Sequence, residues 1–236
     1  MSSRATGRIV GALFLVAFIA YGGGSALIDA GAGTPAVLAD VADHQLLISA
    51  GALLMLVNSV VVAGIGILVF PVLRKHHEIS AHTYLVTRVF EAVVMAVGVL
   101  FLLLLIPLGK EYADAGAGDA PALSSLARVA QEGNLYAYQI AMMVLGVGAL
   151  MFCRVLLRER LVPRFLAVWG MVGYAIFSAG AVLEVLRYGV GLALSVPGGL
   201  FEVALGVLLV VKGFPAVQAQ DLAAPALDLP LEPVAS

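Results

Sequence analysis

Six long runs of apolar residues, separated by short segments that carry most of the charges, set the pattern of this chain. A transmembrane helix needs about 20 consecutive and mostly apolar residues. Each run is about that long or longer. The pattern therefore predicts an all-α fold, a bundle of six transmembrane helices at about residues 9–28, 45–70, 82–107, 135–157, 164–186 and 192–212.

The remaining segments complete one transmembrane domain over residues 1–215. A secretory signal is the alternative for the first run, but the apolar core of a signal is only about 7 to 15 residues long. Residues 109–133 form the longest predicted loop, in which a short surface helix could begin at Pro121. Residues 216–236 are mainly Ala, Pro, Leu and acidic residues, which predicts a disordered tail.

The composition supports a membrane protein and excludes several other classes. Hydrophobic residues make up 62% of the 236 residues and charged residues only 12%, about half of the charged fraction of a typical soluble domain. No basic stripe or aromatic platform indicates nucleic-acid binding. The single cysteine, Cys153, excludes an intrachain disulfide and a cysteine-based zinc site.

Lysine and arginine residues are distributed unequally between the two sides of the predicted bundle. Loops on the cytoplasmic side of a membrane are enriched in these residues. One side carries Arg4, Arg8, Arg74, Lys75, Arg154, Arg158, Arg160, Arg164 and Lys212, whereas the other carries Lys110, Arg128 and Arg187. The asymmetry predicts that both termini are cytoplasmic.

Four polar residues inside the predicted spans form a candidate cluster. Arg88 and Glu91 are three residues apart and share a helix face, Asn58 is near the middle of its span, and Glu202 lies in the last span. At about 1.5 Å per residue, Glu91 and Glu202 are both about 13 to 15 Å from the predicted cytoplasmic face. Charged residues at this depth are rare, usually paired and often functional.

The cluster has two interpretations. In the structural one, Arg88 pairs with one or both glutamates and fixes how the two helices are oriented. In the functional one, two carboxylates with one arginine leave a surplus negative charge, which a proton or a cationic solute neutralises. Proton-coupled transport or solute binding would use that chemistry.

Two further features of the last spans concern the side opposite to the cytoplasm. Glu184 and Arg187 are three residues apart near the outer end of the fifth span, which predicts an interfacial salt bridge, or an outer gate. Pro197, Gly198 and Gly199 break the last helix inside the membrane if this helix begins near Val190, as in many transporters. If it begins near residue 196, they form an ordinary helix start.

Several motifs resemble one known family. They are the segments 70–74 (FPVLR), 88–91 (RVFE), 161–170 (LVPRFLAVWG), 198–202 (GGLFE) and 212–214 (KGF). In this order they resemble the bacterial membrane-protein family catalogued as domain of unknown function 4386, over about residues 5 to 215. The resemblance implies a multi-span protein of a bacterial plasma (inner) membrane, without catalytic residues or a cofactor that could be carried over.

Three classes of function stay open on the sequence. A non-enzymatic structural, assembly or regulatory protein is favoured and predicts a dry charge cluster. A small proton-coupled transporter or solute-binding protein predicts a cavity that reaches Glu91 or Glu202. A lipid-modifying enzyme, the least supported class, predicts an interfacial cleft at His44 or His82. No metal or cofactor site is expected, and besides the lipid bilayer the partners, including an oligomer, stay open.

Overall fold

The computed structural model describes residues 2–33, 36–114 and 119–215, and the predicted tail lies outside these ranges. The helices are α1 (Ser3–Ala32), α2 (Leu38–Asp43), α3 (Gln45–Arg74), α4 (Glu78–Leu103), α5 (Leu105–Asp114), α6 (Ala120–Arg158), α7 (Arg164–Val185) and α8 (Gly191–Lys212). The described ranges contain no strand, and six of their helical segments are long and apolar enough to cross a membrane. The predicted all-α class is confirmed.

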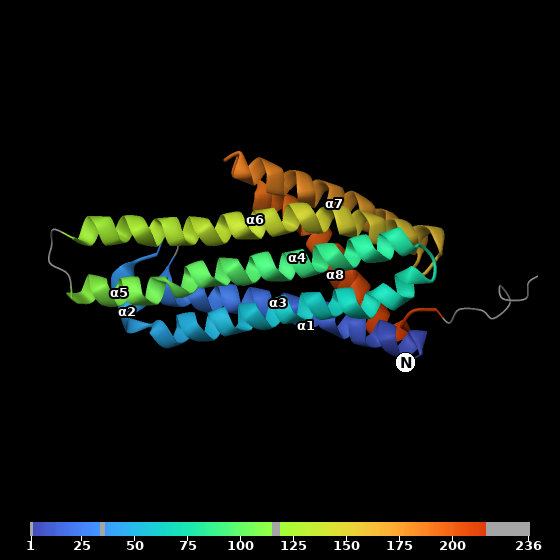
Figure 1. The fold of residues 1–236 in the computed structure, drawn as a ribbon, viewed down its shortest axis with the longest axis horizontal. Helices are drawn as coiled ribbons and strands as arrows, with labels where there is room; N and C mark the ends of the chain where they lie inside the picture. The colour runs from blue at the N-terminus through green and yellow to red at the C-terminus, as the bar shows by residue number, and fades with distance from the viewer. Residues whose placement is uncertain (1, 34–35, 115–118, 216–236) are drawn as a thin grey trace, which may run out of the picture.

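The six long helices form a closed ring in the order α1, α3, α4, α6, α7, α8 and back to α1. Neighbours in the ring run antiparallel, because short connections link successive helices, and α1 begins beside the end of α8 (Figure 1). Apolar side chains cover the outside of the ring. Leu46, Ile19 and Val60, for example, are each more than 70% exposed, as suits a surface that faces lipid.

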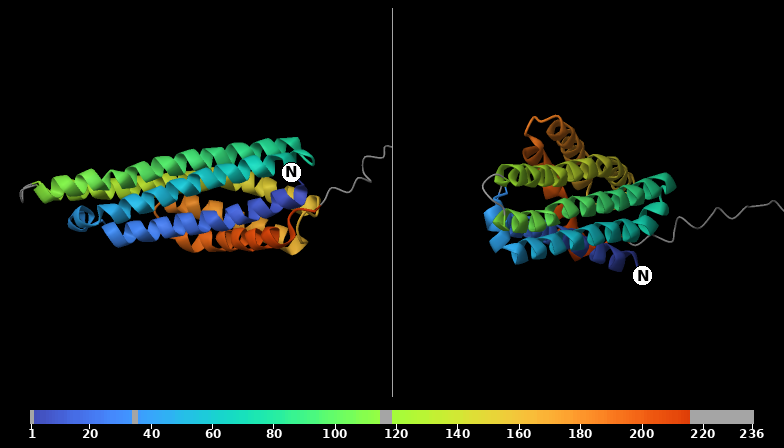
Figure 2. Two further views of the ribbon diagram at one scale, coloured as in Figure 1. Left: turned by 90° about the horizontal axis from the view of Figure 1, so that it is seen from below. Right: turned by 60° about the vertical axis from the view of Figure 1, so that its left-hand side comes forward.

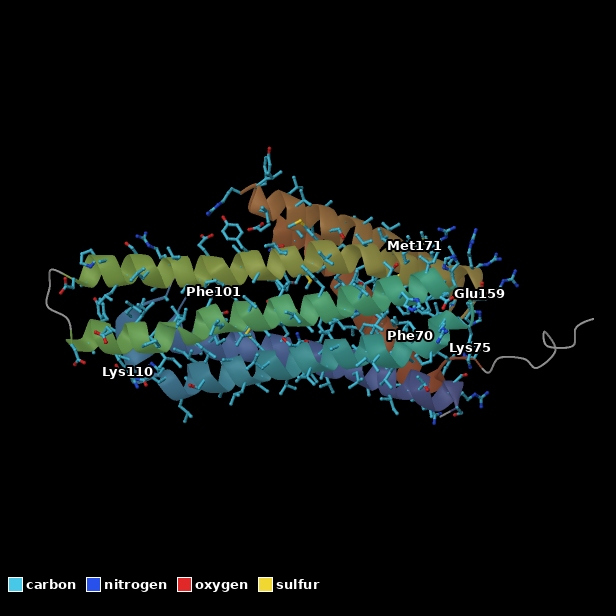
Figure 3. All side chains as sticks on the ribbon, viewed as in Figure 1. Phe70, Lys75, Phe101, Lys110, Glu159 and Met171 are labelled. Carbon is cyan, nitrogen blue, oxygen red and sulfur yellow. The ribbon has the colours of Figure 1, made fainter. Side chains whose placement is uncertain are left out.

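The two ends of the bundle differ in charge. Lys75 and Glu159 lie at one end and Lys110 at the other (Figure 3). We call the first the basic end. The ends of α3, α6, α8 and the start of α7 lie there, with Arg74, Lys75, Arg158, Arg160, Arg164 and Lys212. The opposite end is built by α2, α5 and the first turns of α6 (Figure 2).

The predicted loop at residues 109–133 is mostly helical, which corrects the sequence interpretation. Helix α5 continues α4 to Asp114, and α6 begins at Ala120 and runs unbroken for 39 residues. At about 1.5 Å per residue α6 is about 58 Å long, roughly twice the hydrocarbon thickness. Hydropathy missed this extension because residues 109–133 include many small, polar and charged residues, and a helix does not need a continuous apolar run.

Glycines bring neighbouring helices together where backbones approach closely. A Cβ atom on Gly24 of α1 would lie 2.7 Å from the carbonyl oxygen of Gly51 in α3. Gly11 of α1 meets Gly206 of α8 in the same way. Small residues allow such contacts in membrane bundles, so the ring is tightly closed at these positions.

Candidate functional site

The charge cluster lies inside the ring and centres on Arg88 of α4. Its guanidinium is almost completely buried, with 1% of the residue exposed. Nη1 donates to both oxygens of Glu91, at 2.9 and 3.3 Å, and Nη2 donates to Oε1 of Glu202 at 3.1 Å. The structure therefore brings Arg88, Glu91 and Glu202 together and links α4 to α8 across the ring.

Two tyrosines complete the hydrogen bonds of the cluster. Arg88 Nε donates to the hydroxyl of Tyr84 at 3.0 Å, and the hydroxyl of Tyr174 in α7 donates to Oε1 of Glu202. Sequence reasoning missed both tyrosines. Tyr84 was detectable, because it precedes Arg88 by one turn and so shares its helix face, whereas only the three-dimensional fold brings Tyr174 to Glu202.

Aromatic rings surround the guanidinium. The Arg88 Cζ atom lies 5.4 Å from the centre of the Phe14 ring and 5.3 Å from that of Tyr84. Tyr84 in turn stacks on Phe152 of α6, with ring centres 4.7 Å apart. A cation over an aromatic face within about 6 Å is attracted by the ring, so these contacts help to hold a charge away from water.

The two glutamates occupy different environments. Glu91 uses both oxygens for Arg88, and its side chain is only 4% exposed. Glu202 engages Arg88 and Tyr174 through the same oxygen, and its side chain keeps 17% of its surface exposed. Glu202 is therefore the carboxylate of the pair that a solute can reach more easily.

Asn58 is buried near the cluster, and its amide is directed at Met95 of α4. Its Nδ2 lies 3.8 Å from the sulfur of Met95. Asn58 also takes part in lining a cavity beside the cluster. The structure thus places Asn58 in the wall of this cavity.

A central cavity of about 310 Å³ adjoins the cluster, and all six ring helices contribute to its wall. Its lining is mostly apolar and aromatic, with Arg88, Glu91 and Glu202 at one end. From there it extends away from the basic end, along α1 from Phe14 to Gly22 and along α8 from Glu202 back to Ser195. Toward the basic end the interior is closed by fully buried side chains, including Leu73, Tyr84 and Phe152.

A second hollow, of about 470 Å³, lies nearer the opposite end. Polar residues line it, among them Ser25, Asp29, Arg128, Gln131 and Glu132. Tyr21 of α1 belongs to the walls of both hollows. Its ring stacks on Tyr138 of α6, with centres 5.5 Å apart, so this tyrosine pair stands between the outer hollow and the central cavity.

The predicted pair of Glu184 and Arg187 does not form. Helix α7 ends at Val185, and Arg187 has a positive φ of 69°, so the two residues do not share a helix face. Glu184 Oε2 accepts the backbone N–H of Gly191 at 2.7 Å, while Arg187 lies 3.3 Å from Glu132 of α6. The first contact joins the end of α7 to the start of α8, and the second joins their connection to α6.

The last helix is continuous through Pro197, Gly198 and Gly199, so of the two alternatives the break is absent from α8, and these residues are not its start either. The helix begins at Gly191 and has 22 residues, which is long enough to cross a membrane. The carbonyl of Pro197 accepts a hydrogen bond from Trp169 Nε1 at 3.1 Å. Gly198 packs on Gly173 of α7 and, with Gly199, also lines the cavity.

Taken together, the ring and its cavity define a multi-pass helical membrane protein with a charge cluster beside a partly open hollow. The chain belongs to the family described as Domain of unknown function (DUF4386), whose profile matches residues 9–213. No curated protein and no solved structure matched the chain. Among the described residues, no group of three or more His, Cys, Asp and Glu side chains is arranged to hold a metal ion.

Proposed function

We propose that this protein is a small-solute carrier that binds its solute in the central cavity. The observation that carries the proposal is a hollow of about 310 Å³, walled by all six long helices, with three charged side chains at one end. Ligand sites are commonly hollows of about this size or larger, with apolar walls and a few polar groups that orient the ligand. The cavity matches that description.

The cavity favours a carrier over a purely structural role for the cluster. A structural clamp needs the ion pairs of Arg88 but no cavity beside them. Here Arg88 joins α4 to α8, and Glu202 is in addition part of the cavity wall. We infer that the same residues hold the helices together and form the polar end of a solute site.

An enzymatic role has less support. His44 and His82 lie at opposite ends of the bundle, at the starts of α3 and α4. Each ring contacts the carbonyl oxygen four residues earlier, at 2.9 Å in both cases. Both contacts are local to the histidine's own stretch of chain, and neither histidine lines the central cavity.

We further propose that the protein lies in a bacterial plasma membrane with the basic end in the cytoplasm. The positive residues of the basic end support the orientation, and the family resemblance supports the membrane. The central cavity then extends from the cluster toward the outer side. The packed residues of the basic end close it toward the cytoplasm, as in the outward-facing state of a carrier.

Cysteine accessibility tests the proposal. Ala17 lines the cavity, whereas Ala149 is fully buried in the wall of α6 and is not part of the lining. In a Cys153→Ala background, Ala17→Cys and Ala149→Cys are treated with a membrane-impermeant methanethiosulfonate reagent, in vesicles of either orientation. We expect Ala17→Cys to react from both sides, because a carrier opens alternately, and Ala149→Cys from neither. Reaction from one side only would overturn the carrier, and no reaction would overturn the solute site.

A further inference from the structure

The charges that line the central cavity do not cancel. Arg88 contributes one positive charge, and Glu91 and Glu202 contribute two negative charges when ionised, so the formal sum is −1. A charge buried in a low-dielectric place is costly unless it is compensated. A ligand with one positive charge provides that compensation, whereas an anion would add to the net negative charge.

Aromatic rings form a large part of the same wall. Phe18 and Tyr21 come from α1, Tyr138 from α6, and Tyr174 and Phe177 from α7. Phe14 also lines the cavity, but its ring already lies against Arg88. Aromatic faces bind organic ammonium groups, above all those with several alkyl substituents, so the rings and the surplus carboxylate recognise the same kind of group.

The remaining lining limits the size and polarity of the ligand. A volume of about 310 Å³ equals the liquid volume of about ten water molecules, which admits one aromatic ring with a substituted ammonium group. Apart from the three charged residues and the tyrosine hydroxyls, the polar side chains of the wall are Asn58 and Ser195. A sugar or a nucleotide would lose more hydrogen bonds to water than this wall replaces.

We propose that the solute is a monovalent organic cation, with its ammonium group against Glu202 and Tyr174 and its apolar body between the rings of Phe18, Tyr21, Tyr138 and Phe177. This inference rests on the proposed solute site and specifies its chemical class. Glu202 is the contact for the cation because its carboxylate is the more exposed of the two. Arg88 remains paired with Glu91 while the ligand is bound.

Charge discrimination by the unaltered protein is the first test. Binding of benzyltrimethylammonium, benzyl alcohol and benzenesulfonate is measured by calorimetry, with the protein in nanodiscs of zwitterionic lipid and empty nanodiscs as the blank. We expect the cation to bind at least about tenfold more tightly than the alcohol, because about 1.4 kcal/mol of charge and ring attraction corresponds to that ratio. Equal or tighter binding of the alcohol or the sulfonate would overturn the proposal.

Matched variants then assign the contacts. Glu202→Gln and Phe177→Leu remove the proposed carboxylate and one ring of the site. Glu78→Gln and Phe165→Leu are their controls, because Glu78 is an exposed partner of Arg74 and Phe165 is a 70% exposed residue of the same helix as Phe177. We expect the first two to weaken cation binding by about tenfold or more and the controls to leave it unchanged.

The cysteine experiment distinguishes a failure of the proposed solute site from a failure of the proposed chemical class of its solute. If Ala17→Cys reacts with the reagent but the three probes bind without preference for the cation, the solute site stands and its proposed chemical class fails. If Ala17→Cys does not react and no probe binds, the site itself fails. Wild-type cation binding that Glu202→Gln leaves intact would remove Glu202 as the contact and would overturn the proposal as stated.

Discussion

At the residue scale, the burial of Arg88 determines how the cluster responds to substitution. Its guanidinium meets Glu91, Glu202 and Tyr84 with 1% of the residue exposed. Removing one partner of a buried ion pair leaves a charge without compensation, which costs about 3 to 5 kcal/mol. We expect Arg88→Met to lower the free energy of unfolding in detergent by that amount.

The same substitution at Arg74 is the control for Arg88→Met. Arg74 pairs with Glu78 at 3.5 Å, but both side chains are at least 60% exposed, and exposed pairs contribute about 0 to 1 kcal/mol. Addition of Glu91→Gln and Glu202→Gln to Arg88→Met should restore part of the loss, because it removes the uncompensated carboxylates. Equal effects of Arg88→Met and Arg74→Met would contradict a buried clamp.

We predict that the two glutamates contribute unequally, Glu91 more to the stability of the protein and Glu202 more to the binding of the cation. Glu91 holds Arg88 with both oxygens, whereas Glu202 shares one oxygen between Arg88 and Tyr174. Glu91→Gln should therefore reduce thermal stability more than Glu202→Gln does. Glu202→Gln should reduce the affinity for benzyltrimethylammonium more than Glu91→Gln does. Thermal unfolding and calorimetry on the same preparations measure both, and a reversed order in either would contradict the assigned roles.

At the scale of elements, the close contact of α3 and α4 positions the cluster. A Cβ atom on Gly66 would lie 2.8 Å from Arg88 Cβ, whereas the nearest atom to a Cβ on Gly64 is Leu13 Cδ1 at 3.9 Å. Gly66→Ala must therefore push the two helices apart, which typically costs about 1 to 3 kcal/mol. Gly64→Ala makes only an ordinary van der Waals contact with Leu13 and gains helix propensity of up to about 1 kcal/mol.

Thermal unfolding of the Gly66→Ala and Gly64→Ala variants checks this contact. We expect Gly66→Ala to lower the unfolding temperature and Gly64→Ala to leave it unchanged or raise it. Gly66→Ala should also weaken cation binding, because Arg88 and Glu91 move with α4 relative to Glu202 of α8. Two variants of equal stability would show that α3 and α4 do not pack as closely as described.

The sequence predicted the helices well where hydropathy decides them and less well elsewhere. Apolar runs indicated the six long helices, whereas most of α5 and the first turns of α6 lie in residues 109–133, which hydropathy assigns to a loop. Depth along the helices placed Glu91 and Glu202 at one level, and the structure joins them through Arg88. Neither hydropathy nor depth predicts that α7 ends at Val185 or that Arg187 has a positive φ. The Glu184–Arg187 pair was therefore predicted wrongly.

At the scale of the whole molecule, the ring contains two hollows in series with tyrosines between them. The central cavity adjoins the charge cluster, and the outer hollow lies toward the opposite end. Tyr21 is part of both walls and stacks on Tyr138. A solute that enters the cavity through the outer hollow must pass this pair, so the tyrosine stack should limit the rate of entry.

Removal of one ring tests this route. Tyr138→Ala deletes one member of the stack, whereas Tyr136→Ala removes a tyrosine of the same helix that lies over Arg187 and lines neither hollow. With Ala17→Cys as the reporter, we expect Tyr138→Ala to speed labelling from the opposite end by about tenfold, the effect of about 1.4 kcal/mol on a barrier. Tyr136→Ala should leave the rate unchanged. Equal rates in both variants would mean that solute reaches the cavity by another path, between α1 and α8 or through the lipid-facing wall.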